Sequence, residues 1–230
     1  MLKQKKLENK FVIKCSCFNC FEDKNKLYLN LMNKRGILAI FTVLIIILID
    51  QVSKIYIKTT MRLEDSFAVL GNWFYIHFTE NPGMAMGLSW GGVVGKYALS
   101  SFRLVAISVL IYYIYTLVKK NAHIGFIFAM SLILAGATGN IFDSLFYGLY
   151  FSESTIFEVA KAFPEKGYTT FMQGKVVDML YFPMFYMPKW VPVLGGHKFF
   201  PYIFNIADAA ITIGVFIIFF FQKKFALTEK

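Results

Sequence analysis

Cysteine and histidine are scarce in this chain, which has three of each in 230 residues. The cysteines lie at positions 15, 17 and 20, inside a polar, lysine-rich start of the chain. A metal or redox site there would need further ligands, and the sequence has no second ligand pair or histidine nearby. An incidental cysteine cluster is therefore the better interpretation. The histidines are scattered, and the sequence predicts no metal site and no cofactor.

Long apolar runs dominate the rest of the chain. Hydrophobic residues make up 57% of it and the mean hydropathy is +0.55, which is too apolar for a soluble domain. Four runs are long enough to cross a hydrocarbon core of about 30 Å, which takes about 20 residues. The runs are 36–57, 97–118, 124–149 and 202–221. The sequence therefore predicts an all-α membrane protein with four transmembrane helices.

Acidic residues are also few, 14 against 24 lysines and arginines, which gives a net charge of +10. A nucleic-acid partner is one explanation, but the basic residues gather beside the apolar runs: nine precede Gly36, and pairs occur at 119–120 and 223–224. That distribution is typical of cytoplasmic loops. We therefore expect both termini to be cytoplasmic and no nucleic acid to bind.

Three parts follow from this topology. Residues 1–35 form a basic cytoplasmic tail, residues 36–221 the four-span domain, and residues 222–230 a second tail. Met32 is an alternative start, which would leave residues 1–31 upstream of the protein. The outer connections carry two predicted features: a hairpin over 67–78 around a Gly-Asn turn, giving a small extracytoplasmic β element, and an aromatic, proline-rich loop after Phe182.

Three aspartates, Asp50, Asp143 and Asp208, interrupt apolar runs. A carboxylate at that depth costs about 2.5–3.5 kcal/mol even on the mildest insertion scale, so it needs a compensating role. Asn140 and Asn205 each come three residues before one of these acids, which puts both side chains on the same helix face. The pattern indicates a polar site inside the membrane domain.

Asp178, between the last two spans, can return to the same outer boundary as Asp208. Two adjacent carboxylates share a proton and can activate water, as in aspartic proteases. Alternatively, Asp178 is a solvated loop acid and Asp208 pairs with a lysine or a backbone amide. The spacing leaves both open. A transporter relaying ions through Asp143 and Asp208 is a rival class, weakened by the lack of inverted repeats, and a structural scaffold would not need buried acids.

Five short blocks occur in order along the chain. They are Asp50-Gln-Val-Ser-Lys54, Asn81-Pro-Gly83-Met-Ala85, Gly139-Asn140-Ile-Phe-Asp143, Gly174-Lys-Val-Val-Asp178 and Phe204-Asn205-Ile-Ala-Asp208. Together they resemble the signature blocks of the bacterial lipoprotein signal peptidases, also called signal peptidase II, over about residues 36–221.

The resemblance implies a membrane aspartic endopeptidase that removes the signal peptide from diacylglyceryl-cysteine-modified prolipoproteins. It implies a catalytic dyad of Asp178 and Asp208. The implied substrate-binding or site-ordering residues are Asp50, Lys54, Asn81, Gly83, Asn140, Asp143 and Asn205. The implied partners are the lipid-modified prolipoprotein and membrane lipids, and the protein is expected to be a monomer in the bacterial inner membrane with its active site on the periplasmic side.

The chain departs from the family pattern at several points. Ser144 stands where the family commonly has arginine, and Met86 stands where an aromatic residue is usual. The segments 152–171 and 183–201 look like insertions beside the site. Lys175 is a candidate to replace the missing arginine.

Overall fold

Four long apolar helices make up most of the protein. The computed structural model describes residues 34–82, 92–184, 186–190, 196, 198 and 200–226. The predictions for the cysteines, Gly83 and Met86 therefore lie outside the described residues. The helices are a first helix Lys34–Thr60, α2 Gly92–Lys119, α3 Ile124–Tyr150 and α4 Ile206–Ala226. Their length and composition fit a membrane protein, as the sequence predicts.

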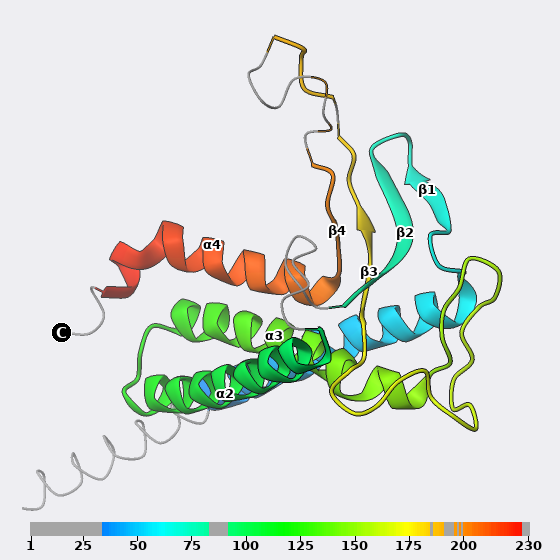
Figure 1. Cartoon of the computed structure of the whole chain (residues 1–230). Helices are drawn as coiled ribbons and strands as arrows, with labels where there is room; N and C mark the ends of the chain where they lie inside the picture. The colour runs from blue at the N-terminus through cyan, green and yellow to red at the C-terminus, as the bar shows by residue number, and fades with distance from the viewer. Residues whose placement is uncertain are drawn as a thin grey trace, which may run out of the picture.

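The helices run side by side, with α3 between α4 and the pair formed by the first helix and α2 (Figure 1). In α3, 56% of the most apolar window is buried, against 17% in each of the other three helices. The outer helices expose large apolar side chains such as Phe41, Phe102 and Phe220. A helix that is apolar on all sides is stable only in a core or in lipid. The outer faces are therefore suited to lipid, and α3 is the central helix.

Side-chain caps define where α3 and α4 begin. The Nδ1 atom of His123 accepts a hydrogen bond from the backbone N–H of Gly125 at 3.0 Å. At α4, the Oδ1 atom of Asn205 accepts from the backbone N–H of Asp208 at 2.9 Å, and asparagine is a preferred N-cap. The predicted start of this span at Tyr202 was therefore four residues early, because Asn205 caps the helix and the residues before it join a sheet.

A four-stranded antiparallel sheet stands at the end of the bundle where α3 ends and α4 begins (Figure 1). Its strands, in spatial order, are β1 Ser66–Leu70, β2 Phe74–Asn81, β3 Val176–Tyr181 and β4 Ile203–Phe204. The predicted hairpin over 67–78 is confirmed, and its turn contains Gly71 with φ of 51°. The sequence did not predict that β3 and β4 extend this hairpin. Because Asp178 lies in β3, the sheet sets its position.

The chain between α3 and β3 folds back over the end of α3. The backbone N–H of Thr169 donates to the carbonyl oxygen of Gly148 at 3.0 Å, and that of Gly174 donates to the carbonyl oxygen of Ser144 at 2.9 Å. Ser144 is only 2% exposed beneath this segment. The segment that follows the insertion, at Gly174, thus covers the position where the family pattern has an arginine.

Candidate active site

Side chains from the first helix, α3, β3 and α4 converge where the bundle meets the sheet. Most of the predicted polar site residues are buried there, and Asp50, Lys54, Asp143 and Asn205 are fully inaccessible to solvent. Asp178 is 3% exposed, whereas Asp208 is half-buried in the first turn of α4. Residues predicted from separate sequence blocks thus share one polar cluster.

Two asparagines connect the two aspartates. The Nδ2 atom of Asn205 donates to Asp178 Oδ1 at 2.6 Å and to Asn140 Oδ1 at 3.1 Å. The Nδ2 atom of Asn140 donates to Asp208 Oδ1 at 2.7 Å. Hydrogen bonds to carboxylates are among the strongest in proteins, and a connected network rigidifies its members. The carboxylates are therefore held in fixed orientation by neutral amides.

A buried lysine lies behind this bridge. The Nζ atom of Lys54 is 2.9 Å from Asp50 Oδ2 and 2.8 Å from Asp143 Oδ2, and it donates to Asn140 Oδ1 at 2.9 Å. All three donor positions of the ammonium group are therefore used. Because Lys54 binds the oxygen of Asn140, it fixes which way that amide faces, so that Nδ2 points to Asp208.

Asp50 links the first helix to α4. Its Oδ1 atom accepts a hydrogen bond from the backbone N–H of Ala207 at 2.9 Å. The N-terminal turn of a helix has unpaired N–H groups and favours a negative charge. Gly139 permits this approach, since a Cβ atom at that position would lie 2.6 Å from Asp50 Oδ2. The close crossing of the three helices therefore depends on a residue without a side chain.

Asp178 lies in an environment that favours its neutral form. Burial, followed by repulsion from Asp208, raises the pKa of Asp178 to about 7, against the opposing effect of hydrogen bonds from Asn205 and Asn81. Asn81 at the end of β2 thus contacts the site, as the sequence block suggests. Asp178 therefore keeps its proton to a higher pH than a solvent-exposed aspartate does.

Sequence reasoning missed two residues of the site. Gln51 donates from Nε2 to Asp143 Oδ1 at 2.8 Å, and the hydroxyl of Tyr147 donates to Gln51 Oε1 at 3.1 Å. Gln51 follows Asp50 in its block, and Tyr147 lies four residues after Asp143 on the same helix face. Spacing could have placed Tyr147 beside Asp143, whereas the contact between Gln51 and Asp143 joins two helices and has no local signal.

A second buried ionic cluster lies beside the first. Lys58, fully buried, pairs with Glu80 and donates to Ser154 Oγ at 2.8 Å, while Lys175 Nζ is 3.3 Å from Glu80 Oε2. Burial alone would raise the pKa of Glu80, but Lys58, with Ser154 and Lys175, outweighs it and lowers the pKa. Glu80 pairs across the sheet with Val177, next to Asp178. The cluster therefore ties the first helix and the insertion to the strand that carries Asp178.

Taken together, these features define a four-helix membrane protein with a carboxylate site where the bundle meets a small sheet. The sequence profile of Signal peptidase (SPase) II matches residues 42–223 of the chain. This match covers well over half of the 230 residues. The chain belongs to the signal peptidase II family.

Individual relatives agree with this assignment. The chain is 46% identical over 182 residues to a lipoprotein signal peptidase of Porphyromonas gingivalis, covering 76% of this chain and 78% of the relative. It is 36% identical to one from Amoebophilus asiaticus, covering 76% and 73%. A solved bacterial membrane enzyme matches with a TM-score of 0.54 at 28% identity, covering 84% of this chain and 91% of that one.

Proposed function

We propose that this protein is an aspartic endopeptidase that removes the signal peptide from prolipoproteins whose cysteine carries diacylglycerol. The observation that carries this proposal is the pair Asp178 and Asp208, joined through Asn205 and Asn140 by bonds of 2.6, 3.1 and 2.7 Å. The family match and the relatives named lipoprotein signal peptidase support the substrate class.

In the proposed mechanism, the two aspartates have different roles. Asp208 takes a proton from water as the water oxygen bonds to the scissile carbonyl carbon. Asp178, whose raised pKa of about 7 favours the protonated form, donates a hydrogen bond to the carbonyl oxygen. The proton then passes to the amine nitrogen as the carbon–nitrogen bond breaks. The position of Asp208 in the first turn of α4, where a helix favours negative charge, supports its role as the base.

A recess beside Asp208 supports a substrate that arrives through the membrane. It has a volume of about 280 Å³, and Phe204, Thr212 and Ile213 are among the residues that line it with Asp208. Ile213 on α4 is 52% exposed on the lipid-suited surface. Two acyl chains hold a modified cysteine at the membrane boundary, since each buried CH₂ contributes about 0.8 kcal/mol of membrane affinity. The scissile bond would then arrive at the depth of the aspartates.

The proposed location is the bacterial inner membrane, with both termini cytoplasmic, the sheet and active site on the periplasmic side, and the protein a monomer. The positive side chains at the ends of the helices opposite the sheet support this orientation. A membrane-impermeant maleimide tests it in a protein whose three natural cysteines are replaced by serine: it should label a Glu158→Cys variant on intact spheroplasts, and a Lys120→Cys variant only after lysis. The reverse labelling pattern would contradict the orientation.

The test of activity uses purified protein and a lipidated prolipoprotein, with the mass of the product measured. Asp178→Asn and Asp208→Asn keep the side-chain size but remove the titrating group, so each should lower turnover by at least about 10²-fold. Glu158→Gln, which removes an exposed carboxylate from the insertion, is the matched control and should cleave normally. Near-full turnover in either aspartate variant, with helix content unchanged, would show that the dyad is wrong.

The same assay tests the substrate. The prolipoprotein without diacylglycerol should not be cut, because nothing would hold its scissile bond at the site. Asn81→Ala should reduce cleavage of the lipidated substrate more than it reduces thermal stability. Equal cleavage of both substrates would instead indicate an intramembrane protease without lipid specificity.

A further inference from the structure

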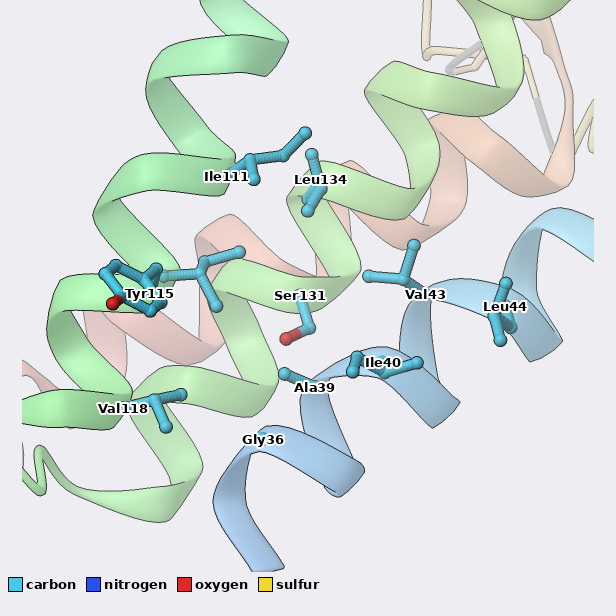
Figure 2. Close-up of a pocket in the computed structure, with 11 residues that line it drawn as sticks. Gly36, Ala39, Ile40, Val43, Leu44, Ile111, Tyr115, Val118, Ser131 and Leu134 are labelled. Atoms are coloured by element: carbon cyan, nitrogen blue, oxygen red, sulfur yellow. The ribbon is translucent and has the colours of Figure 1, made fainter. Parts of the chain in front are cut away.

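An apolar groove lies between the first helix, α2 and α3, on the face of α3 away from α4 (Figure 2). Its volume is about 370 Å³, within the range of about 300–1,000 Å³ that small-molecule sites occupy. Ile40, Val43 and Ile111 contribute to its apolar lining. The hydroxyl of Ser131 also lines it but donates to Ile127 O at 2.8 Å within its own helix. The groove is thus suited to a hydrocarbon chain.

The groove is confined to one half of the membrane domain. Along the first helix it extends from Gly36 to Leu44, which is about 12 Å at 1.5 Å per residue. One leaflet of a bilayer contributes about 15 Å of hydrocarbon. The groove ends at the helix termini farthest from the sheet, where Gly36 lies close to Val118 near the end of α2. It therefore lies within a single leaflet.

Four basic residues surround this end of the groove. They are Lys34, Arg35, Lys119 and Lys120, hereafter the basic rim. Lys119 Nζ lies 4.6 Å from the ring centre of Tyr115, which itself lines the groove. No acidic residue occurs in 34–49 or 105–142, the parts of the chain that surround the groove; the nearest acids in sequence are Asp50 and Asp143. The rim is therefore a concentrated positive charge at the mouth of an apolar groove.

We propose that the groove and the basic rim bind one anionic glycerophospholipid, with an acyl chain in the groove and the phosphate at the rim. Charge complementarity selects this occupant over a zwitterionic lipid, since basic pockets between membrane helices bind anionic head groups. The proposal is independent of the peptidase activity, because the groove contains none of the aspartates of the site.

A second hollow on α2 provides an internal comparison. Its volume is about 430 Å³, and it is lined by Leu104, Val105, Ser108, Val109 and Tyr112, without a basic residue. It can contact lipid tails as well as the groove can, but its lining carries no charge, and Arg103, which precedes Leu104, is attracted to Asp208 on α4. Anionic lipid should therefore be enriched at the groove and not at this hollow.

The experiment measures which lipid lies at each place. The three natural tryptophans are replaced by phenylalanine, and one tryptophan is introduced by Ile111→Trp in the groove or by Val109→Trp in the hollow. Each variant is reconstituted in phosphatidylcholine with the same fraction of brominated-chain phosphatidylglycerol or brominated-chain phosphatidylcholine. Bromine quenches only nearby tryptophan. We expect phosphatidylglycerol to be preferred about five-fold or more at Ile111→Trp, since one basic side chain near an anionic lipid contributes about this factor. No preference is expected at Val109→Trp.

Two lysine pairs test the role of the rim. The double change Lys34→Gln and Lys119→Gln should clearly reduce the preference at Ile111→Trp, because it removes two of the four charges of the rim. The matched change Lys223→Gln and Lys224→Gln, at the end of α4, should leave it intact. Equal quenching by both lipids, or equal loss in both pairs, would overturn the proposal. The proposal would also be overturned if the full-length protein showed no preference and a protein without residues 1–31 did. In that case the groove of the full-length protein would be occupied by its own N-terminal segment.

Discussion

The hydrogen bond from Asn205 to Asp178 predicts a shift in the pH dependence of cleavage. Asn205 Nδ2 lies 2.6 Å from Asp178 Oδ1 and stabilises the charged carboxylate, which opposes the rise in the pKa of Asp178 to about 7. A hydrogen bond to a charged group contributes about 1.5–3 kcal/mol. One pKa unit corresponds to about 1.36 kcal/mol, so removing this bond should raise the pKa of Asp178 by about one to two units.

The direction follows from the proposed role of Asp178 as the protonated partner. Activity is lost as pH rises through its pKa, so a higher pKa moves the basic limb of the kcat/KM profile to higher pH. Asn205→Ser and Asn205→Ala should show the same displacement, because neither side chain reaches Asp178. They differ in stability: serine can still cap α4, whereas alanine loses the cap at a cost of about 1 kcal/mol. Comparing the two variants therefore separates the effect of the helix cap on stability from the effect of Asn205 on the pKa of Asp178.

The assay is kcat/KM for a lipidated prolipoprotein, measured from about pH 5 to pH 10 to cover both limbs. Asn121→Ala, which removes the partner of Arg35 at the opposite end of the bundle, is the control and should leave the profile unchanged. A basic limb that stays in place or moves to lower pH in both Asn205 variants would refute the reasoning.

Three further predictions concern the bundle. Lys54→Met should lower the free energy of unfolding by about 3–5 kcal/mol, because it leaves two buried carboxylates without their cation; an unchanged denaturation midpoint in detergent would contradict this. Gly136→Ala should destabilise by about 1–3 kcal/mol, since a Cβ atom there would lie 2.2 Å from the carbonyl oxygen of Ala207. Gly36→Ala is the control: its Cβ atom would have its nearest neighbour at 3.9 Å, so it should change the melting temperature little. Equal destabilisation by Gly136→Ala and Gly36→Ala would contradict the role of Gly136 in helix packing. Deleting residues 1–31 should leave membrane insertion and cleavage unchanged, and loss of cleavage would assign a function to that segment.

Hydrophobic run length predicted the four helices well, because span length is set by the membrane and not by tertiary contacts. The hairpin around Gly71 was predictable for a similar reason, since a local turn determines its register. The start of α4 was not. Ile203 and Phe204 are as apolar as the helix that follows, and only their pairing with Tyr181 and Leu180 assigns them to a strand.

The polar site was predictable to the extent that its residues interrupt apolar runs. Asp143 and Asn140 stood out because a polar group in such a run needs a partner. Lys58 and Glu80 did not stand out, because the end of a span and an outer strand are ordinary locations for charge. Their burial results from the insertion folding back over α3, a long-range contact that no local pattern encodes.

The spacing of Asp50 and Lys54 bears on how the protein enters the membrane. The first helix is synthesised before α3 exists, so Lys54 then lacks Asp143. Residues four apart meet on one face of a helix, and these two lie 2.9 Å apart in the finished protein. The pair can therefore neutralise itself within a single helix during insertion, avoiding the cost of an isolated buried charge. When α3 packs against the first helix, Asp143 adds a second carboxylate, and the ion pair within one helix becomes a contact between two helices.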